Sequence, residues 1–180
     1  MTAHRRSAAR PLCPEGSLCV SEIAPCDRDA IPEDHPVRVF DDFWHGLPRQ
    51  RLPHRDALTP AAIPSLLKWL MILEQGGTTE HPTFVVRLQG TAVQALSAGN
   101  LTGRELAAFT EGDAYRSRLA LFRDVIAAAA PRYGRATLIS PSNAKIPTSV
   151  GVFPFCTNDP ARHHLVIIAG PDDAALRAAL

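Results

Sequence analysis

The chain has no long apolar run, little net charge and few cysteines, and each of these shortages excludes a class of protein. No run of 18 apolar residues occurs in the 180-residue sequence, so we expect no membrane-spanning segment. The basic start, residues 1–10, is not followed by an apolar segment, which argues against a secretory signal peptide. The 19 basic and 18 acidic side chains leave a net charge of +1, so no direct nucleic-acid partner is expected.

The four cysteines are too few and too unevenly spaced for a disulfide-stapled secreted scaffold, and this favours a cytoplasmic location. Cys13, Cys19 and Cys26, with His35 further on, could be counted as four metal ligands. Their gaps are wider than the paired spacing that is typical of structural zinc sites. We therefore interpret these cysteines as incidental thiols and expect no metal site.

The common catalytic motifs are also missing from the sequence. No GxGxxG, Walker or HExxH pattern is present. Cys156, His163 and His164 could form a thiol and its base, but no motif around them indicates an oxyanion hole. We expect no catalytic activity. The cofactor stays open, because any of the seven histidines could ligate a haem iron.

The distribution of prolines and charges divides the chain into three parts. Residues 1–36 are rich in proline and opposed charges and show almost no periodicity, which is typical of a disordered or loosely ordered tail. Residues 37–170 hold the periodic segments of one folded domain, and residues 171–180 are expected to add a short helical tail.

The domain begins with a segment, residues 37–47, that carries an apolar stripe at helical spacing. The stripe consists of Val39, Phe40, Phe43, Trp44 and Leu47. Such a helix either packs back on its own domain or forms a dimer surface, and the sequence leaves both open.

The rest of the domain alternates between strand and helix patterns. Residues 68–75 and 84–89 are expected to pair as antiparallel strands, and residues 113–130 show the stripe of a long amphipathic helix. Further strands are expected at residues 133–139, 148–156 and 163–169. This order predicts an α+β domain, an antiparallel sheet with its helices on one face.

The strand at residues 84–89 and the two turns after it contain several residues with expected structural roles. Gly90 and Gly103 are expected to be backbone requirements where the chain changes direction. Arg87 lies on the face opposite Phe84, so it either pairs across the hairpin with a carboxylate such as Glu74 or anchors an anion in a pocket, and cross-strand pairing is the favoured reading.

Several literal motifs resemble those of a proteobacterial PAS-like family, over residues 40–170. They are FDDFW at residues 40–44, LPHRDALTPAAIPSLL at 52–67, FVVRLQGT at 84–91 and LTG at 101–103. The resemblance implies a PAS fold, a five-stranded antiparallel sheet in the order 2-1-5-4-3 with helices covering one inner face. It also implies a sensory or interaction module of bacterial signal transduction that lacks enzyme activity.

In that arrangement the apolar face of the strand at residues 84–89 meets the long helix. The expected ligand-binding residues are Phe84, Val86, Leu88, Tyr115, Leu119, Phe122 and Phe153, with Val152 as the alternative to Phe153. A cavity among them would suit a small apolar or aromatic molecule with one hydrogen-bonding group, and the alternative is a solid core without ligand.

The expected partners follow from the same reading. They are a second copy of the chain in a homodimer, and a signalling protein that receives the signal by contact. The alternative function is a small-molecule-binding, enzyme-like domain or a haem-binding sensor.

Overall fold

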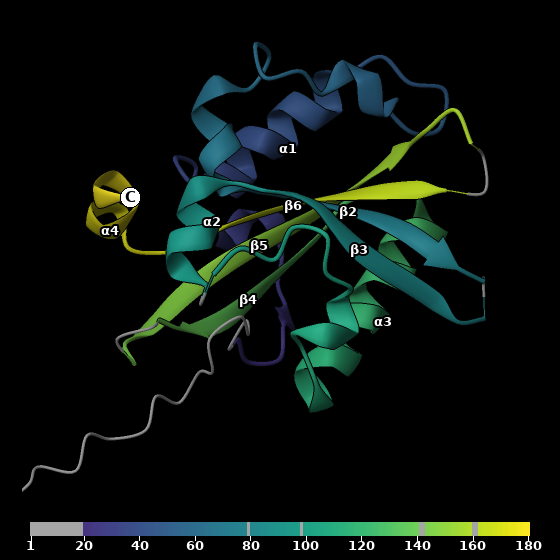
Figure 1. Ribbon diagram of the computed structural model, residues 1–180. Helices are drawn as coiled ribbons and strands as arrows, with labels where there is room; N and C mark the ends of the chain where they lie inside the picture. The colour runs from purple at the N-terminus through teal and green to yellow at the C-terminus, as the bar shows by residue number, and fades with distance from the viewer. Residues whose placement is uncertain (1–19, 79, 98, 141–142, 160–161) are drawn as a thin grey trace, which may run out of the picture.

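One antiparallel sheet of six strands forms the centre of the protein (Figure 1). The computed structural model describes residues 20–78, 80–97, 99–140, 143–159 and 162–180. The strands are β1 (Ala24–Pro25), β2 (Leu70–Gly77), β3 (Pro82–Gln89), β4 (Arg132–Ile139), β5 (Lys145–Cys156) and β6 (His163–Pro171). Their order across the sheet is β1-β4-β5-β6-β2-β3. No helix among the described ranges is long and apolar enough to cross a membrane.

The expected strands all occur, but the sheet has six strands and not the expected five, so its full order differs from the expected one. The sixth strand is β1, which pairs with β4 through Ala24 opposite Arg135 and adds a short edge strand. The five expected strands, β2 to β6, lie in the order β3-β2-β6-β5-β4, which is the expected order 2-1-5-4-3 when β2 is counted as the first strand. β2 begins two residues later than expected, because Pro64–Trp69 forms the 3-10 helix η3.

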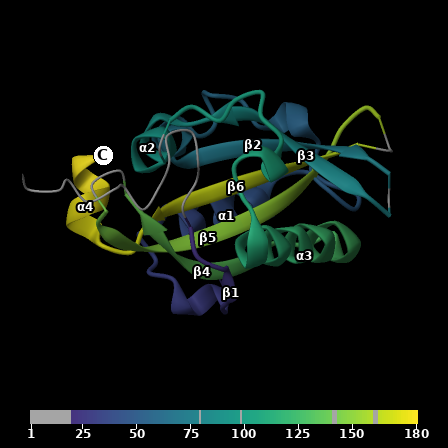
Figure 2. The ribbon, with the colours of Figure 1, turned by 60° about the horizontal axis from the view of Figure 1, so that its bottom comes forward.

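Helices cover both faces of the sheet, so the expectation of helices on one face is also wrong. The helices are α1 (Pro36–Gly46), α2 (Thr91–Leu96), α3 (Gly112–Ala128) and α4 (Ala174–Ala179). α1 packs on β5 and β6 on one side, whereas α3 packs on β5 on the other (Figures 1 and 2). In Figure 2, α3 lies in front of the sheet and α1 behind it.

Two apolar cores result, one on each face of the sheet. β2 shows the division: Leu70 and Ile72 belong to the core under α1, and Met71 and Leu73 to the core under α3. Successive side chains of a strand point to opposite faces, so a continuous apolar run such as residues 70–73 requires cover on both.

The N-terminal segment up to residue 36 was expected to be a loosely ordered tail, and its described part, residues 20–36, packs on the domain instead. Ile31 is only 1% exposed and His35 is fully buried. The composition of this segment does not predict its packing, because apolar side chains such as Ile31 can be buried against the edge of the sheet. The area that they bury offsets the conformational entropy that the short segment loses. Residues 1–19, with Cys13 and Cys19, lie outside the described residues.

Candidate functional site

A cavity of about 70 Å³ lies between α3 and the face of the sheet that α3 covers. Roughly 10–15 Å³ by this measure holds one water molecule, so the cavity has room for several non-hydrogen atoms. Its walls are almost entirely apolar, and they are formed by Val20, Ile23, Met71, Leu73, Val93, Leu106, Phe109, Arg118, Phe122, Leu138, Thr148, Val150, Ile167 and Ala169. Thr148 is committed to the backbone, because its hydroxyl donates to the carbonyl of Ile146 at 3.0 Å.

α3 presents a different face to the sheet from the one its apolar stripe predicts. Its buried residues are Arg118, Phe122 and Val125, spaced by four and three. Tyr115 and Leu119, which the sequence places among the ligand-binding residues, are partly buried at the border of this core. The helix was predicted correctly, but its orientation was not, because a charged residue occupies the centre of the buried face.

Two strand residues from the expected site do lie beside α3. Phe84 and Val86 are buried in the same core as Phe122, and the rings of Phe84 and Phe122 meet edge to face with centroids 5.1 Å apart. Phe122 lines the cavity directly, whereas Phe84 and Val86 are not among its lining residues.

Leu88 does not share the face of Phe84 and Val86, and it is 39% exposed. The register between β2 and β3 shifts at Ile72 and Leu73, so Leu73 pairs with Val86 while Ile72 pairs with Leu88. Directly paired residues share a face of the sheet, and Leu88 therefore lies on the α1 side with Ile72. A bulge of this kind reverses what strict alternation predicts.

Phe153 also lies on the opposite face of the sheet from the cavity. It is fully buried and packs against Phe40 of α1, with ring centroids 4.8 Å apart. Its neighbour Val152, the alternative that the sequence allowed, is fully buried in the core under α3. Since adjacent residues of β5 point to opposite faces, only one of the two could face α3.

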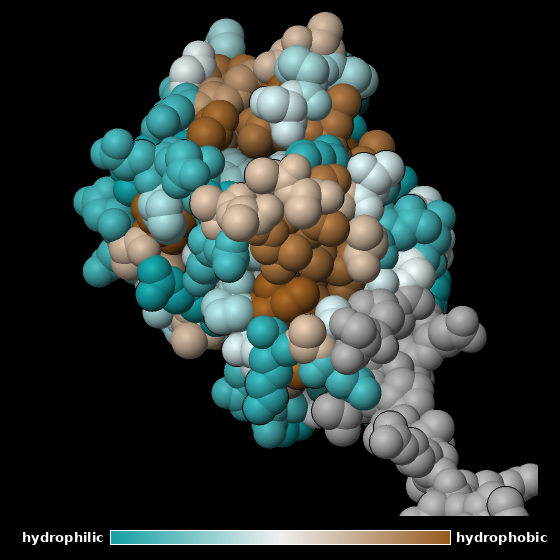
Figure 3. Space-filling model, turned by 90° about the vertical axis from the view of Figure 1, so that its left-hand side faces the viewer, coloured by the Kyte–Doolittle hydropathy of each residue, from teal (hydrophilic) through white to brown (hydrophobic). Residues whose placement is uncertain are grey.

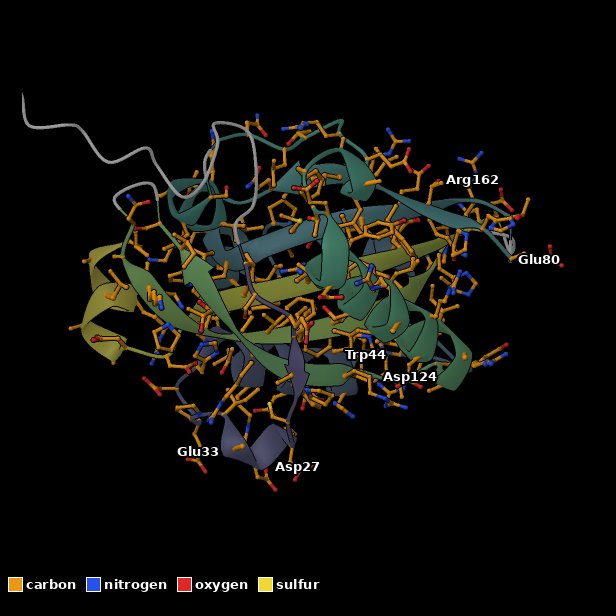
Figure 4. The ribbon with its side chains drawn as sticks, turned by 90° about the horizontal axis from the view of Figure 1, so that it is seen from below. Asp27, Glu33, Trp44, Glu80, Asp124 and Arg162 are labelled. Carbon is orange, nitrogen blue, oxygen red and sulfur yellow. The ribbon has the colours of Figure 1, made fainter. Side chains whose placement is uncertain are left out.

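Other walls of the cavity come from segments that the sequence reading did not connect with the site. Leu106 and Phe109 belong to the segment after β3, which is held at the edge of that strand by a hydrogen bond from Val86 N–H to the carbonyl of Arg104 at 2.9 Å. Val20 and Ile23 come from the N-terminal segment, where Ile23 N–H donates to Ser117 Oγ of α3 at 3.3 Å. Figure 4 looks onto this side, with α3 and the N-terminal segment in front of the sheet.

Arg118 is the residue that sets this cavity apart from an ordinary apolar core. It lines the cavity and is only 5% exposed. Its Nη1 donates to the carbonyl of Ala114 at 2.7 Å and to that of Ser21 at 3.5 Å. Desolvation by burial lowers the pKa of Arg118 to about 10, so the guanidinium stays charged at neutral pH.

The comparison with known protein families agrees with this architecture. A family model described as PAS domain matches residues 33–166, well over half of the chain. The chain belongs to the PAS domain family. The matched stretch includes both α1 and α3, and therefore both layers that cover the sheet. No curated protein matches the chain.

In this PAS domain Arg87 makes the cross-strand pair that the sequence favoured. Its Nε and Nη2 donate to the two carboxylate oxygens of Glu74 at 2.8 and 3.0 Å. Arg162 adds a third hydrogen bond to Glu74 at 3.0 Å. The hydrogen bonds from Arg87 lower the pKa of Glu74. Arg87 is thus a partner of Glu74 at the surface and lies away from the cavity.

The PAS domain separates the two histidines that could have accompanied the Cys156 thiol. Cys156 lies opposite His163 in the pairing of β5 with β6, whereas His164 lies on the other face, 3.6 Å from Glu74. The thiol of Cys156 donates to the carbonyl of Pro53 at 3.4 Å. Within the part of the chain that the structure describes, no cluster of three His, Cys, Asp or Glu residues could hold a metal ion.

Proposed function

We propose that the protein is a sensory module that binds a small molecule in the cavity between α3 and the sheet, and that passes the signal on by contact with another protein, without catalysis of its own. The observation that supports the proposal is the cavity itself, which is placed in the core of a PAS domain and carries one buried charge. Packed cores contain few voids larger than a water molecule, so a void of this size is a candidate binding site.

The position of the cavity suggests how ligand binding can change the surface of the protein. Phe122 and Arg118 are wall residues on α3, and Leu106 and Phe109 are wall residues on the segment that precedes it. A ligand that changes the packing of these side chains changes the position of α3 relative to the sheet. α3 carries exposed charged residues on its outer face, such as Arg116 and Asp124. A partner protein that contacts this face would bind differently once α3 has shifted.

A homodimer is part of the proposal. Its proposed contact surface is the exposed side of α1 beside α4, and not the aromatic stripe of α1 that the sequence offered. The aromatic stripe of α1 is used inside the chain, because Val37, Phe40 and Trp44 are all buried. On the same helix Val39 is 42% exposed and lies beside Ala174 and Ala178 of α4 at a shallow groove. Figure 3 views the molecule from the side of α4 and shows apolar residues gathered at the middle of this face.

Substitution of Phe122 by Trp tests the ligand site. Phe122 is 1% exposed and borders the cavity, so the larger indole should occupy the free volume and block binding while the domain stays folded. Benzene and indole serve as small apolar probes, and their binding is followed through backbone amide shifts in NMR spectra. Native mass spectrometry of the purified wild type reports any molecule that is retained.

The matched control is Phe43→Trp, because Phe43 is a partly buried phenylalanine of α1 on the other face of the sheet. We expect the control to bind the probes as the wild type does. Unchanged probe binding by Phe122→Trp, or the absence of amide shifts in the wild type with either probe, would contradict the proposal.

A further inference from the structure

A buried charge without a counter-charge is unusual in a protein core, and Arg118 has no counter-charge among the residues that the structure describes. Arg177 offers a comparison within the same chain, since it is 8% exposed and pairs with Asp34 at 2.7 Å. Arg118 is 5% exposed, yet it forms no ion pair with any described residue. Desolvation of an unpaired charge is costly, so such a residue is expected to have a partner in the working state of the protein.

The hydrogen bonds of Arg118 to the described residues use only one nitrogen of its guanidinium. Both go from Nη1 to backbone carbonyls, one within α3 and one in the N-terminal segment. Nε and Nη2 make no hydrogen bond to the residues that the structure describes. The Nε–Nη2 edge is one that commonly binds a carboxylate through two parallel hydrogen bonds, as Arg87 binds Glu74 in this chain.

We propose that Arg118 binds the carboxylate of a small monocarboxylate whose apolar tail fills the cavity. The proposal rests on the proposed function, because it names the class of ligand that the sensory cavity accepts. The guanidinium supplies the charge and two parallel donors, and side chains such as Met71, Leu73 and Phe109 surround the tail. The carboxylate of the ligand supplies the negative charge that the described residues do not provide to Arg118.

The composition of the walls favours a monoanion over a phosphate or another multiply charged group. Among the described lining residues Arg118 alone is charged, and the other polar side chain of this set, Thr148, donates its hydroxyl hydrogen to a backbone carbonyl. A phosphate dianion would leave one negative charge and several acceptor oxygens without partners in an apolar cavity. Inorganic phosphate is therefore a suitable negative probe.

Calorimetric titration of the full chain with matched pairs of probes tests the proposal. The pairs are benzoate against benzamide, and hexanoate against hexan-1-ol, all at neutral pH. We expect each carboxylate to bind the wild type at least tenfold more tightly than its neutral counterpart, and inorganic phosphate not to bind. Arg118→Met should lose this preference and still bind the neutral probes. It should also melt at a higher temperature without ligand, because it removes a desolvated charge.

Arg116→Met is the matched control, since Arg116 is an exposed arginine of the same helix and pairs with Asp113. We expect it to keep the preference for carboxylates. Arg118→Gln is a second variant that keeps a hydrogen-bond donor toward Ala114 and removes the charge, and it should also lose the preference.

The outcomes separate this inference from the proposed function. Neutral probes that bind the wild type as tightly as their carboxylates would overturn the role of Arg118 and leave the sensory cavity in place. Carboxylates that bind Arg118→Met or Arg118→Gln as tightly as the wild type would do the same. If no probe of either kind binds, both the inference and the proposed function are wrong.

Discussion

Gly90 shows how a single residue can be required for a reason other than a left-handed backbone. Its φ is −72°, which any residue can adopt, whereas Gly103 has a φ of +84°. A Cβ at Gly90 would lie 2.2 Å from the carbonyl oxygen of Leu67 and 2.6 Å from that of Lys68. Gly90 is therefore needed because η3 passes directly over it.

We expect Gly90→Ala to lower the free energy of unfolding by about 1–3 kcal/mol, because the added methyl group forces two backbone segments apart. Gly46→Ala is the control, since a Cβ at Gly46 in α1 would meet nothing within 4 Å. That change should be neutral or stabilising by up to about 1 kcal/mol. Urea denaturation of the two variants measures both values, and equal stability for the pair would contradict the close-approach explanation.

At the scale of the elements, α1 is held to the sheet by its N-cap. The Nδ1 atom of His35 accepts a hydrogen bond from Val37 N–H at 3.2 Å, and its Nε2–H donates to the carbonyl of Gly170 at 3.1 Å. The ring is fully buried, and this burial lowers the pKa of His35. Arg177 lowers it further, and Asp172 and the carbonyl of Gly170 oppose the shift.

The N-cap predicts a loss of stability in mild acid. The pKa of His35 is lower in the folded than in the unfolded protein, so the unfolded state binds more protons once the pH falls below about 6.5. The contribution of His35 is thus present above that pH and is lost as the pH falls through the folded pKa, when a proton on Nδ1 also removes the cap. We expect the melting temperature to fall between pH 7.5 and pH 5.5.

Thermal melts of His35→Asn at the same two pH values provide the check. Asn keeps an N-cap acceptor and cannot titrate, so the difference between the two melting temperatures should be smaller than in the wild type. Some pH dependence should persist, because burial also lowers the pKa of His163 and of His164. The exposed His81 supplies the control His81→Asn, and an equal pH response of the two variants would argue against the role of the N-cap.

At the scale of the whole molecule, the association of two copies is the property most open to a direct test. Deletion of residues 1–47 is unsuitable, because it removes core residues such as Ile31, Phe40 and Trp44. A single charge on the exposed side of α1 leaves the core intact. We expect the full chain to be dimeric in light scattering, and Val39→Glu to shift it toward the monomer by burying a charge at the contact.

Arg38→Glu is not a matched control for that experiment, since Arg38 pairs with Asp29. Leu88→Glu is preferable, because among the described residues Leu88 is the second exposed large apolar side chain, and it lies on β3 beside Arg55 and Leu58. It should leave the mass unchanged. A wild-type chain that stays monomeric at every concentration tested would rule out the dimer.

The sequence alone determined the type and approximate limits of the main strands and of the long helix α3, and it favoured the pairing of Arg87 with Glu74 over an anion site. These features depend on local periodicity and on turn residues, which a single chain segment carries by itself. The motifs shared with the PAS family also identified the correct family. Phe84, Val86 and Phe122 were placed together correctly, because Phe122 belongs both to the apolar stripe of α3 and to the face that is buried.

Only the tertiary structure decided which faces meet. A bulge in β2 and β3 moved Leu88 to the other side of the sheet, the pleat of β5 did the same to Phe153, and the rotation of α3 placed Arg118 at the cavity. These outcomes depend on how distant segments compete for the same buried area. Which side of each element becomes buried therefore depends on the assembled core, and the periodicity of a single segment does not predict it.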